Sequence, residues 1–259
     1  MEFKYIVSEI KERIGYIYLN RLDKKNALNF EFVSELKNQL KNWETENNIK
    51  AIILASNSDV FSAGADLDAL EKMQTNTFDE NLEDSRHLME LFLLILNYPK
   101  LVISQVEGHA IAGGCGLATV CDFCFAIPEA KFGYTEVKIG FIPALVSIFL
   151  VRKIGEAKAK SLLLTGDLVS SENLYNSSLV HQIYKKEEIK NKVFEWTKKI
   201  IASTSNDSIQ ATKKLINDQW EMCLDDALEM AAYSNAKQRN TEDCKKGIRS
   251  FLNKEKLIW

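Results

Sequence analysis

The sequence LVISQVEGHAIAGGCGLATVCDFCFAIPEAKFGYTEVKIGFIP, residues 101–143, is the stretch that decides the fold. It begins with a short apolar run, typical of a strand covered on both faces, and Gly108 marks the end of that run. Residues 112–114 lack bulky side chains, so backbone N–H groups that open the next helix can approach a ligand. We interpret this turn as a candidate oxyanion site, which the helix dipole would reinforce. A Gly-Gly turn alone is more often purely structural.

Two further features favour a functional site. The loop NSDVFSAGAD, residues 57–66, follows a second apolar run at residues 51–55, so the ends of two buried strands can face one pocket. Glu136 lies between an aromatic-rich strand and an apolar loop, where desolvation would raise its pKa toward the range useful for acid/base catalysis. The sequence therefore predicts that Glu136 moves a proton.

Length and composition indicate one α/β core with a smaller appendage. The chain has 259 residues, of which 46% are apolar and 27% charged, and its formal net charge is −3. This charge disfavours nucleic acid and anionic membranes as partners. Residues 1–13 contain no basic region followed by a long apolar stretch, so we expect a cytoplasmic protein. The five cysteines and three histidines show no metal-binding spacing, and we expect no metal.

Patterns of apolar residues predict the elements on either side of the central stretch. Residues 74–84 are polar and without periodicity, so we expect a mobile loop there. The remaining expected elements are an antiparallel strand pair within residues 3–18, helices at 30–45, 66–73, 88–96, 144–152 and 156–164, a short strand at 180–184, and helices from 186 onward.

The motifs FSAGAD (61–66), EGHAIAGGCGLA (107–118) and FGYTEVKIGFIP (132–143) resemble, in order and spacing, those of the crotonase (enoyl-CoA hydratase/isomerase) superfamily. The resemblance extends to LNRLDKKNALN (19–29) and TEDCKKGIRSFLNK (241–254). It implies an α/β fold, a spiral of repeated ββα units over residues 1–197, followed by a helical oligomerisation region over residues 198–259. Periodicity alone does not separate this spiral from an open Rossmann sheet.

The resemblance also implies a site and a substrate. The substrate would be an acyl-CoA thioester, as in fatty acid metabolism, with no separate cofactor, and the assembly a homotrimer or hexamer. Ala63 and Gly113 match the oxyanion-hole donors and Glu136 matches an acid/base. The positions that match contacts to coenzyme A or substrate are Lys25, Ala27, Gly64, Ala65, Asp66, Gly116, Phe251 and Lys254.

Gly116 departs from the family pattern, because the two-glutamate hydratases carry a second glutamate there. A single carboxylate at Glu136 is what the double-bond isomerases of the family use. A second departure is the bulkier run at residues 142–147, where many hydratases have glycines. We place an enoyl-CoA hydratase first, with an enoyl-CoA isomerase as the alternative and a non-catalytic acyl-CoA-binding protein as a third reading.

Overall fold

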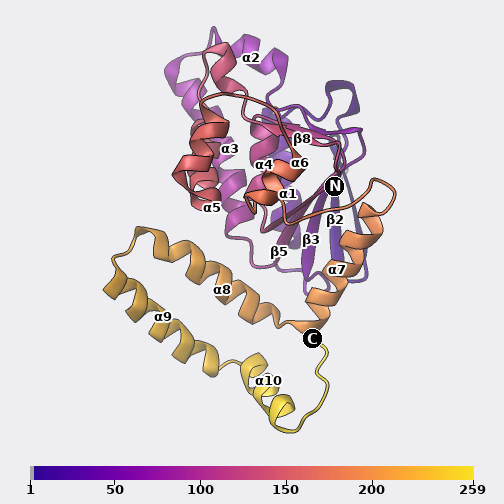
Figure 1. Cartoon of the computed structure of the whole chain (residues 1–259), viewed down its shortest axis with the longest axis vertical. Helices are drawn as coiled ribbons and strands as arrows, with labels where there is room; N and C mark the ends of the chain where they lie inside the picture. The colour runs from indigo at the N-terminus through magenta and orange to yellow at the C-terminus, as the bar shows by residue number, and fades with distance from the viewer. Residues whose placement is uncertain (1–2) are drawn as a thin grey trace.

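A computed structural model describes residues 3–259 (Figure 1). Its larger sheet has six strands in the order β1-β2-β3-β5-β7-β10, and only the β1–β2 pair is antiparallel among these described strands. The strands are β1 (Ile6–Lys11), β2 (Ile14–Leu19), β3 (Ala51–Ser56), β5 (Leu101–Val106), β7 (Phe123–Ala126) and β10 (Gln182–Ile183). Every residue of β3 and β5 is buried, as expected for central parallel strands.

A smaller second sheet has the order β4-β6-β8-β9. It consists of β4 (Val60–Ser62), β6 (His109–Ile111), β8 (Lys131–Gly133) and β9 (Val169–Ser170), and the first three are parallel. Each of these three follows a strand of the larger sheet: β4 follows β3, β6 follows β5, and β8 follows β7. A helix comes after each strand pair, which confirms the repeated ββα unit.

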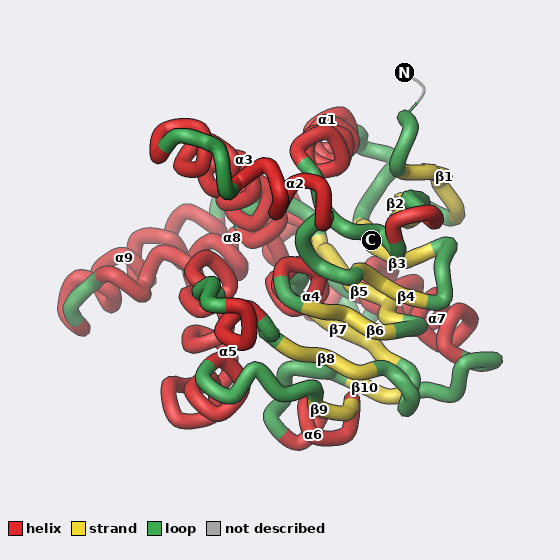
Figure 2. The backbone as a smooth tube through the Cα atoms, turned by 90° about the horizontal axis from the view of Figure 1, so that it is seen from above, coloured by secondary structure: helices red, strands yellow, loops and turns green. Residues whose placement is uncertain are grey.

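Helices cover the sheets. They are α1 (Phe30–Glu44), α2 (Leu67–Met73), α3 (Phe78–Leu96), α4 (Gly113–Val120), α5 (Ala144–Leu163), α6 (Ser171–Asn176) and α7 (Ile189–Ser203), with short 3-10 turns η1 (Leu22–Lys24) and η2 (Glu136–Ile139). The helix α4 is the most deeply enclosed, with all its residues after Gly113 buried. Figure 2 shows it close to β4 and β6, with α3 and α5 on its outer side and α7 across the sheets.

The segment 74–84 is not the loop that the sequence predicted. The helix α3 begins at Phe78, and its start carries a capping box in which the Thr77 hydroxyl accepts from the Glu80 N–H while the Glu80 carboxylate accepts from the Thr77 N–H. This local hydrogen-bonding signal favours a helix start even where apolar periodicity is weak. Further on, α5 is divided at Gly155, whose φ of 76° and ψ of 161° are not helical, so its two parts correspond to the two helices expected at 144–152 and 156–164.

The remaining elements form a C-terminal arm, which we define as α8 (Asn206–Asp218), η3 (Gln219–Glu221), α9 (Leu224–Arg239) and α10 (Glu242–Leu252). Figure 1 shows this arm extending below the core. Lys213 ties α8 to the core through an ion pair with Asp122 at 2.7 Å. The expected domain division at 197/198 falls inside α7. No helix within residues 3–259 has the length and apolar character needed to cross a membrane.

Candidate active site

Three parallel strands of the smaller sheet bring the three central motifs together. The strand β4 pairs with β6 and β6 pairs with β8, so their carboxyl ends lie side by side. Ala63 follows β4, Ala112 and Gly113 follow β6, and Glu136 comes shortly after β8. Ligands of parallel sheets commonly bind at such carboxyl ends. The sequence predicted that the ends of β3 and β5 would face the pocket, whereas the short added strands carry the motifs.

Glycines allow the first two motifs to touch. A Cβ on Gly114 would lie 2.5 Å from the Ser62 Cβ, and a Cβ on Gly64 would lie 2.9 Å from the Ala112 Cβ. Side-chain carbons do not approach this closely, so both positions need glycine for packing. Gly64 also has a φ of 92°, which a residue with a side chain rarely adopts. The FSAGAD loop and the turn before α4 therefore form one contiguous wall.

The turn itself is strained at Ala112, whose φ of 48° and ψ of −125° are unusual for a non-glycine residue. Its N–H donates to the Gly133 carbonyl at 2.7 Å, which holds this conformation in place. Strain of this kind costs about 1–3 kcal/mol and gathers at functional sites. It directs the first turn of α4 across the end of the small sheet.

The two expected oxyanion donors differ in their present hydrogen bonding. Within the described chain, the Gly113 N–H makes no hydrogen bond, as is usual for the first N–H of a helix. The Ala63 N–H donates to the Lys25 carbonyl at 3.0 Å. Ala63 is exposed, so a ligand oxygen could reach this N–H and share or replace that bond. The geometry thus offers one free donor and one that is already engaged.

Glu136 is half-buried at the start of η2, and its Oε2 atom is buried without a hydrogen-bond partner in the described residues. Burial raises the pKa of this carboxyl, and a bond to its own backbone N–H opposes the rise only in part. Burial is the main cause of the raised pKa of the Cys115 thiol in α4, and the Glu136 charge adds to the rise. Glu136 and the first turn of α4 follow the paired strands β8 and β6, so the expected acid/base and the expected oxyanion donor Gly113 come from neighbouring strand ends.

Gly116 faces other helices. A Cβ at this position would lie 2.3 Å from the Val146 Cγ1 in α5 and 3.2 Å from the Phe92 Cζ in α3. Val146 is 5% exposed and Phe92 fully buried. On this side, Gly116 presents no open surface to a ligand, and its expected contact with substrate stays a prediction.

The segment holding Lys25 and Ala27 runs beside the FSAGAD loop. The Leu28 N–H donates to the Gly64 carbonyl at 2.6 Å, and the Asp66 N–H donates to the Leu28 carbonyl at 3.0 Å. Lys25 and Ala65 are exposed, whereas Ala27 is buried. The structure thus brings these expected coenzyme A contacts together along one edge of the site.

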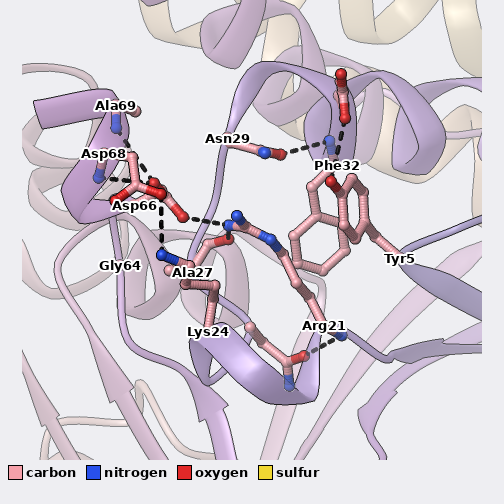
Figure 3. A network of polar contacts seen from close by, with 12 residues as sticks. Tyr5, Arg21, Lys24, Ala27, Asn29, Phe32, Gly64, Asp66, Asp68 and Ala69 are labelled. Carbon is pink, nitrogen blue, oxygen red and sulfur yellow. Dashed lines mark hydrogen bonds and ion pairs between the residues drawn. The ribbon is translucent and has the colours of Figure 1, made fainter. Parts of the chain in front are cut away.

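A buried ion pair fixes this edge, as Figure 3 shows. The Arg21 guanidinium lies 2.5 Å from the Asp66 carboxylate, and it also donates to the Ala27 carbonyl at 2.8 Å. Asp66 accepts as well from the Asp68 and Ala69 N–H groups that open α2. Burial acts to raise the pKa of Asp66, but these hydrogen bonds together lower it. Its carboxylate is thus engaged within the protein, and its expected contact with coenzyme A stays a prediction.

Sequence reasoning missed Arg21 and Asn26. The Asn26 amide is fully buried, where it accepts from the Arg21 N–H at 2.8 Å and donates to the Phe61 carbonyl at 3.1 Å. A signal was present, because polar residues inside LNRLDKKNALN need partners if the segment is buried. The partner segment could not be identified from local sequence.

Phe251 and Lys254 lie apart from these residues within the chain. They belong to the end of α10 and the segment after it, and α10 packs against α8 and α9 below the core (Figure 1). Phe251 is 83% exposed. One chain alone does not bring these two residues to the site.

Comparison with known proteins agrees with the motifs. The model of the enoyl-CoA hydratase/isomerase family matches residues 9–259. The chain belongs to this family. A Thermus thermophilus protein named "Putative enoyl-CoA hydratase" is 39% identical, over 94% of this chain and 96% of its own. The crotonyl-CoA hydratase of Syntrophomonas wolfei is 30% identical, over 99% and 98%.

Solved structures share the fold of this family member. The crystal structure of an enoyl-CoA hydratase from Shewanella pealeana superimposes with a TM-score of 0.92 at 26% identity, covering 100% of this chain and 97% of that one. The crotonase-type α/β fold predicted from the motifs is confirmed.

Proposed function

We propose that this family member acts on an enoyl-CoA thioester, with Glu136 as its single acid/base. The observation that carries this proposal is the buried Oε2 of Glu136, which has no hydrogen-bond partner within residues 3–259. Glu136 follows β8, and the neighbouring strand β6 leads to the free N–H of Gly113. A carboxylate without a partner in a partly buried site costs free energy unless it serves a ligand. A protein that only binds acyl-CoA would gain nothing from it, so we favour an enzyme.

The thioester carbonyl oxygen would accept hydrogen bonds from the Gly113 and Ala63 N–H groups. Negative charge grows on this oxygen when an enolate forms, and each such donor typically contributes about 3–4 kcal/mol to lowering the barrier. The partial positive charge at the start of α4 would add to this stabilisation. Because the Ala63 N–H already donates to Lys25, substrate would bind it by sharing or displacing that bond.

Hydration of a 2-enoyl-CoA is the first candidate reaction, because it matches the names of the relatives. Water adds through its oxygen to Cβ while the Glu136 carboxylate takes one of its protons. The electron pair of the double bond moves to Cα and the carbonyl oxygen, which gives the enolate. Glu136 then returns the proton to Cα, so one carboxylate completes the addition.

Double-bond migration is the second candidate, and the packing at Gly116 favours it. Here Glu136 removes a proton from Cα of a 3-enoyl-CoA, the resulting dienolate is held by the same N–H groups, and the proton returns to Cγ. No water is needed. The exposed apolar residues Ile139, Phe141 and Ile142 after Glu136 offer a surface that an acyl chain could contact.

Coenzyme A would lie along the edge formed by Lys25, Ala27 and residues 64–66. We propose that Phe251 and Lys254 reach the nucleotide of a neighbouring subunit in a homotrimer or hexamer. Large apolar side chains are exposed on the C-terminal arm, including Leu224, Tyr233 and Phe251, and a subunit contact would cover such residues. Analytical ultracentrifugation of the full chain and of Phe251→Ser tests this assembly, which a monomeric full-length protein would contradict.

The decisive experiment offers crotonyl-CoA and a 3-enoyl-CoA separately and identifies the products. Formation of 3-hydroxybutyryl-CoA supports hydration, and formation of a 2-enoyl-CoA from the 3-enoyl substrate supports isomerisation. Both activities should fall by roughly 10²–10⁴-fold in Glu136→Gln. Glu129→Gln is a matched control, because Glu129 is exposed in the turn before β8. If Glu136→Gln turns over as the wild type does, the assignment fails.

A further inference from the structure

Gly116 is needed for packing between helices and not for its backbone conformation. It lies inside α4, and its N–H donates to the Ala112 carbonyl at 3.0 Å as in a regular helix. Alanine would be more favourable by about 1 kcal/mol in a free helix interior. The obstacle is the Val146 Cγ1, only 2.3 Å from where a Cβ would stand. Either Val146 or any side chain at position 116 can occupy this space.

The wall around this space is apolar and well fixed. Phe92 packs edge-on against Phe149, with ring centroids 5.7 Å apart and planes at 86°. Phe92 is fully buried and Phe149 is 9% exposed. After the Val146 Cγ1, the atom nearest to a Cβ on Gly116 would be the Phe92 Cζ, at 3.2 Å. The three atoms nearest to a Cβ at position 116 are all side-chain carbons, and none can donate a hydrogen bond. The charged form of an acidic side chain placed there would therefore be costly.

We propose that Val146 is a specificity-determining residue, which fills the space of a second acidic side chain at position 116 and so restricts this site to one carboxylate. The inference rests on the proposed function of Glu136. Adding water to a double bond benefits from one group that activates water and another that handles the Cα proton. Moving a proton between two carbons needs one carboxylate only. By excluding a second carboxylate, Val146 therefore lowers the rate of hydration relative to the rate of isomerisation.

The steric part is tested by a double-mutant cycle with alanine. Gly116→Ala should lower the melting temperature by roughly 2–10 °C, because overpacking costs about 1–3 kcal/mol. Adding Val146→Ala removes the colliding methyl groups and should recover most of that loss. Ile148→Ala is the matched control, since Ile148 lies in the same helix and is 57% exposed. If the effects of Gly116→Ala and Val146→Ala on the melting temperature are additive, the two positions do not compete for the same space and this part of the proposal is wrong.

The chemical part is tested with Gly116→Glu/Val146→Ala. Its ratio of crotonyl-CoA hydration to 3-enoyl-CoA isomerisation should exceed the wild-type ratio at least tenfold, whereas Gly116→Glu/Ile148→Ala should show no such gain. An unchanged ratio in the first variant, with its folding confirmed by circular dichroism, overturns the specificity role. If wild type and Glu136→Gln are equally inactive on both thioesters, the proposed function fails and the specificity role with it. In that case the double-mutant cycle with alanine still tests whether positions 116 and 146 compete for the same space, because it measures melting temperature and not activity.

Discussion

The Arg21 guanidinium and the Asp66 carboxylate form an ion pair at 2.5 Å with side-chain exposures of 8% and 3%. They belong to the two segments that border the turn at residues 112–114, residues 19–29 and 61–66. Because Asp66 also caps α2, this pair joins the loop before α1, the FSAGAD loop and the start of α2. The shape of the proposed coenzyme A edge depends on it.

Breaking this ion pair should destabilise the protein strongly. Arg21→Met leaves a buried carboxylate without its partner, and such changes cost about 3–5 kcal/mol in the free energy of unfolding. Urea denaturation measures the loss. Lys24→Met is the matched control, because it breaks the neighbouring ion pair with Asp68, whose side chains are 39% and 74% exposed, and should change stability little. Equal effects of the two substitutions would contradict the structural role of Arg21.

Replacing Glu136 should affect catalysis and leave binding intact. Glu136→Gln keeps the side-chain volume and removes the base, so kcat should fall by roughly 10²–10⁴-fold. Isothermal titration with a saturated acyl-CoA should give a Kd within a few-fold of wild type, because the proposed coenzyme A contacts lie on other residues. Loss of binding together with activity would indicate a structural role for Glu136.

The raised pKa of Glu136 predicts two pH effects of opposite sign. Catalysis needs the ionised carboxylate, so kcat/KM should fall on acidification with a midpoint above the ordinary glutamate value of about 4.3. Folding prefers the neutral form of this group, whose contribution to stability is therefore present below pH of about 4.3 and is lost as pH rises through the higher folded pKa.

The melting temperature of the wild type minus that of Glu136→Gln should accordingly decrease as pH rises through this range. A difference that increases with pH would mean that Glu136 has a lowered pKa, contrary to its burial.

Gly113 and Gly114 should respond differently to alanine. The nearest atom to a Cβ on Gly113 is the Leu28 Cδ1 at an ordinary 3.6 Å, whereas a Cβ on Gly114 would collide with Ser62 at 2.5 Å. Gly113→Ala should therefore fold as the wild type does but lose at least tenfold in kcat/KM, because the new methyl group enters the proposed thioester site. Gly114→Ala should instead lose about 1–3 kcal/mol of stability through overpacking. Thermal denaturation and steady-state kinetics on both variants separate the two roles.

Several parts of the fold could be predicted from local patterns. Mostly apolar runs marked β3 and β5, and the stripe of apolar residues marked α1, because burial on two faces or on one stripe leaves a direct trace in the sequence. The order of the three central motifs fixed the family and with it the spiral. The start of α3 also had a local signal, the capping box of Thr77 and Glu80, although the polar composition there suggested a loop.

The sequence by itself determined the motifs, their order and the acidic residue at 136. Only the tertiary structure decided that Arg21 pairs with Asp66, that Gly114 rests on Ser62 and that Val146 fills the space beside Gly116. The physical reason is that each of these pairs joins segments far apart in the chain. Their contact depends on how strands and helices pack, and neither local propensity nor apolar periodicity records which distant side chain will occupy a given space.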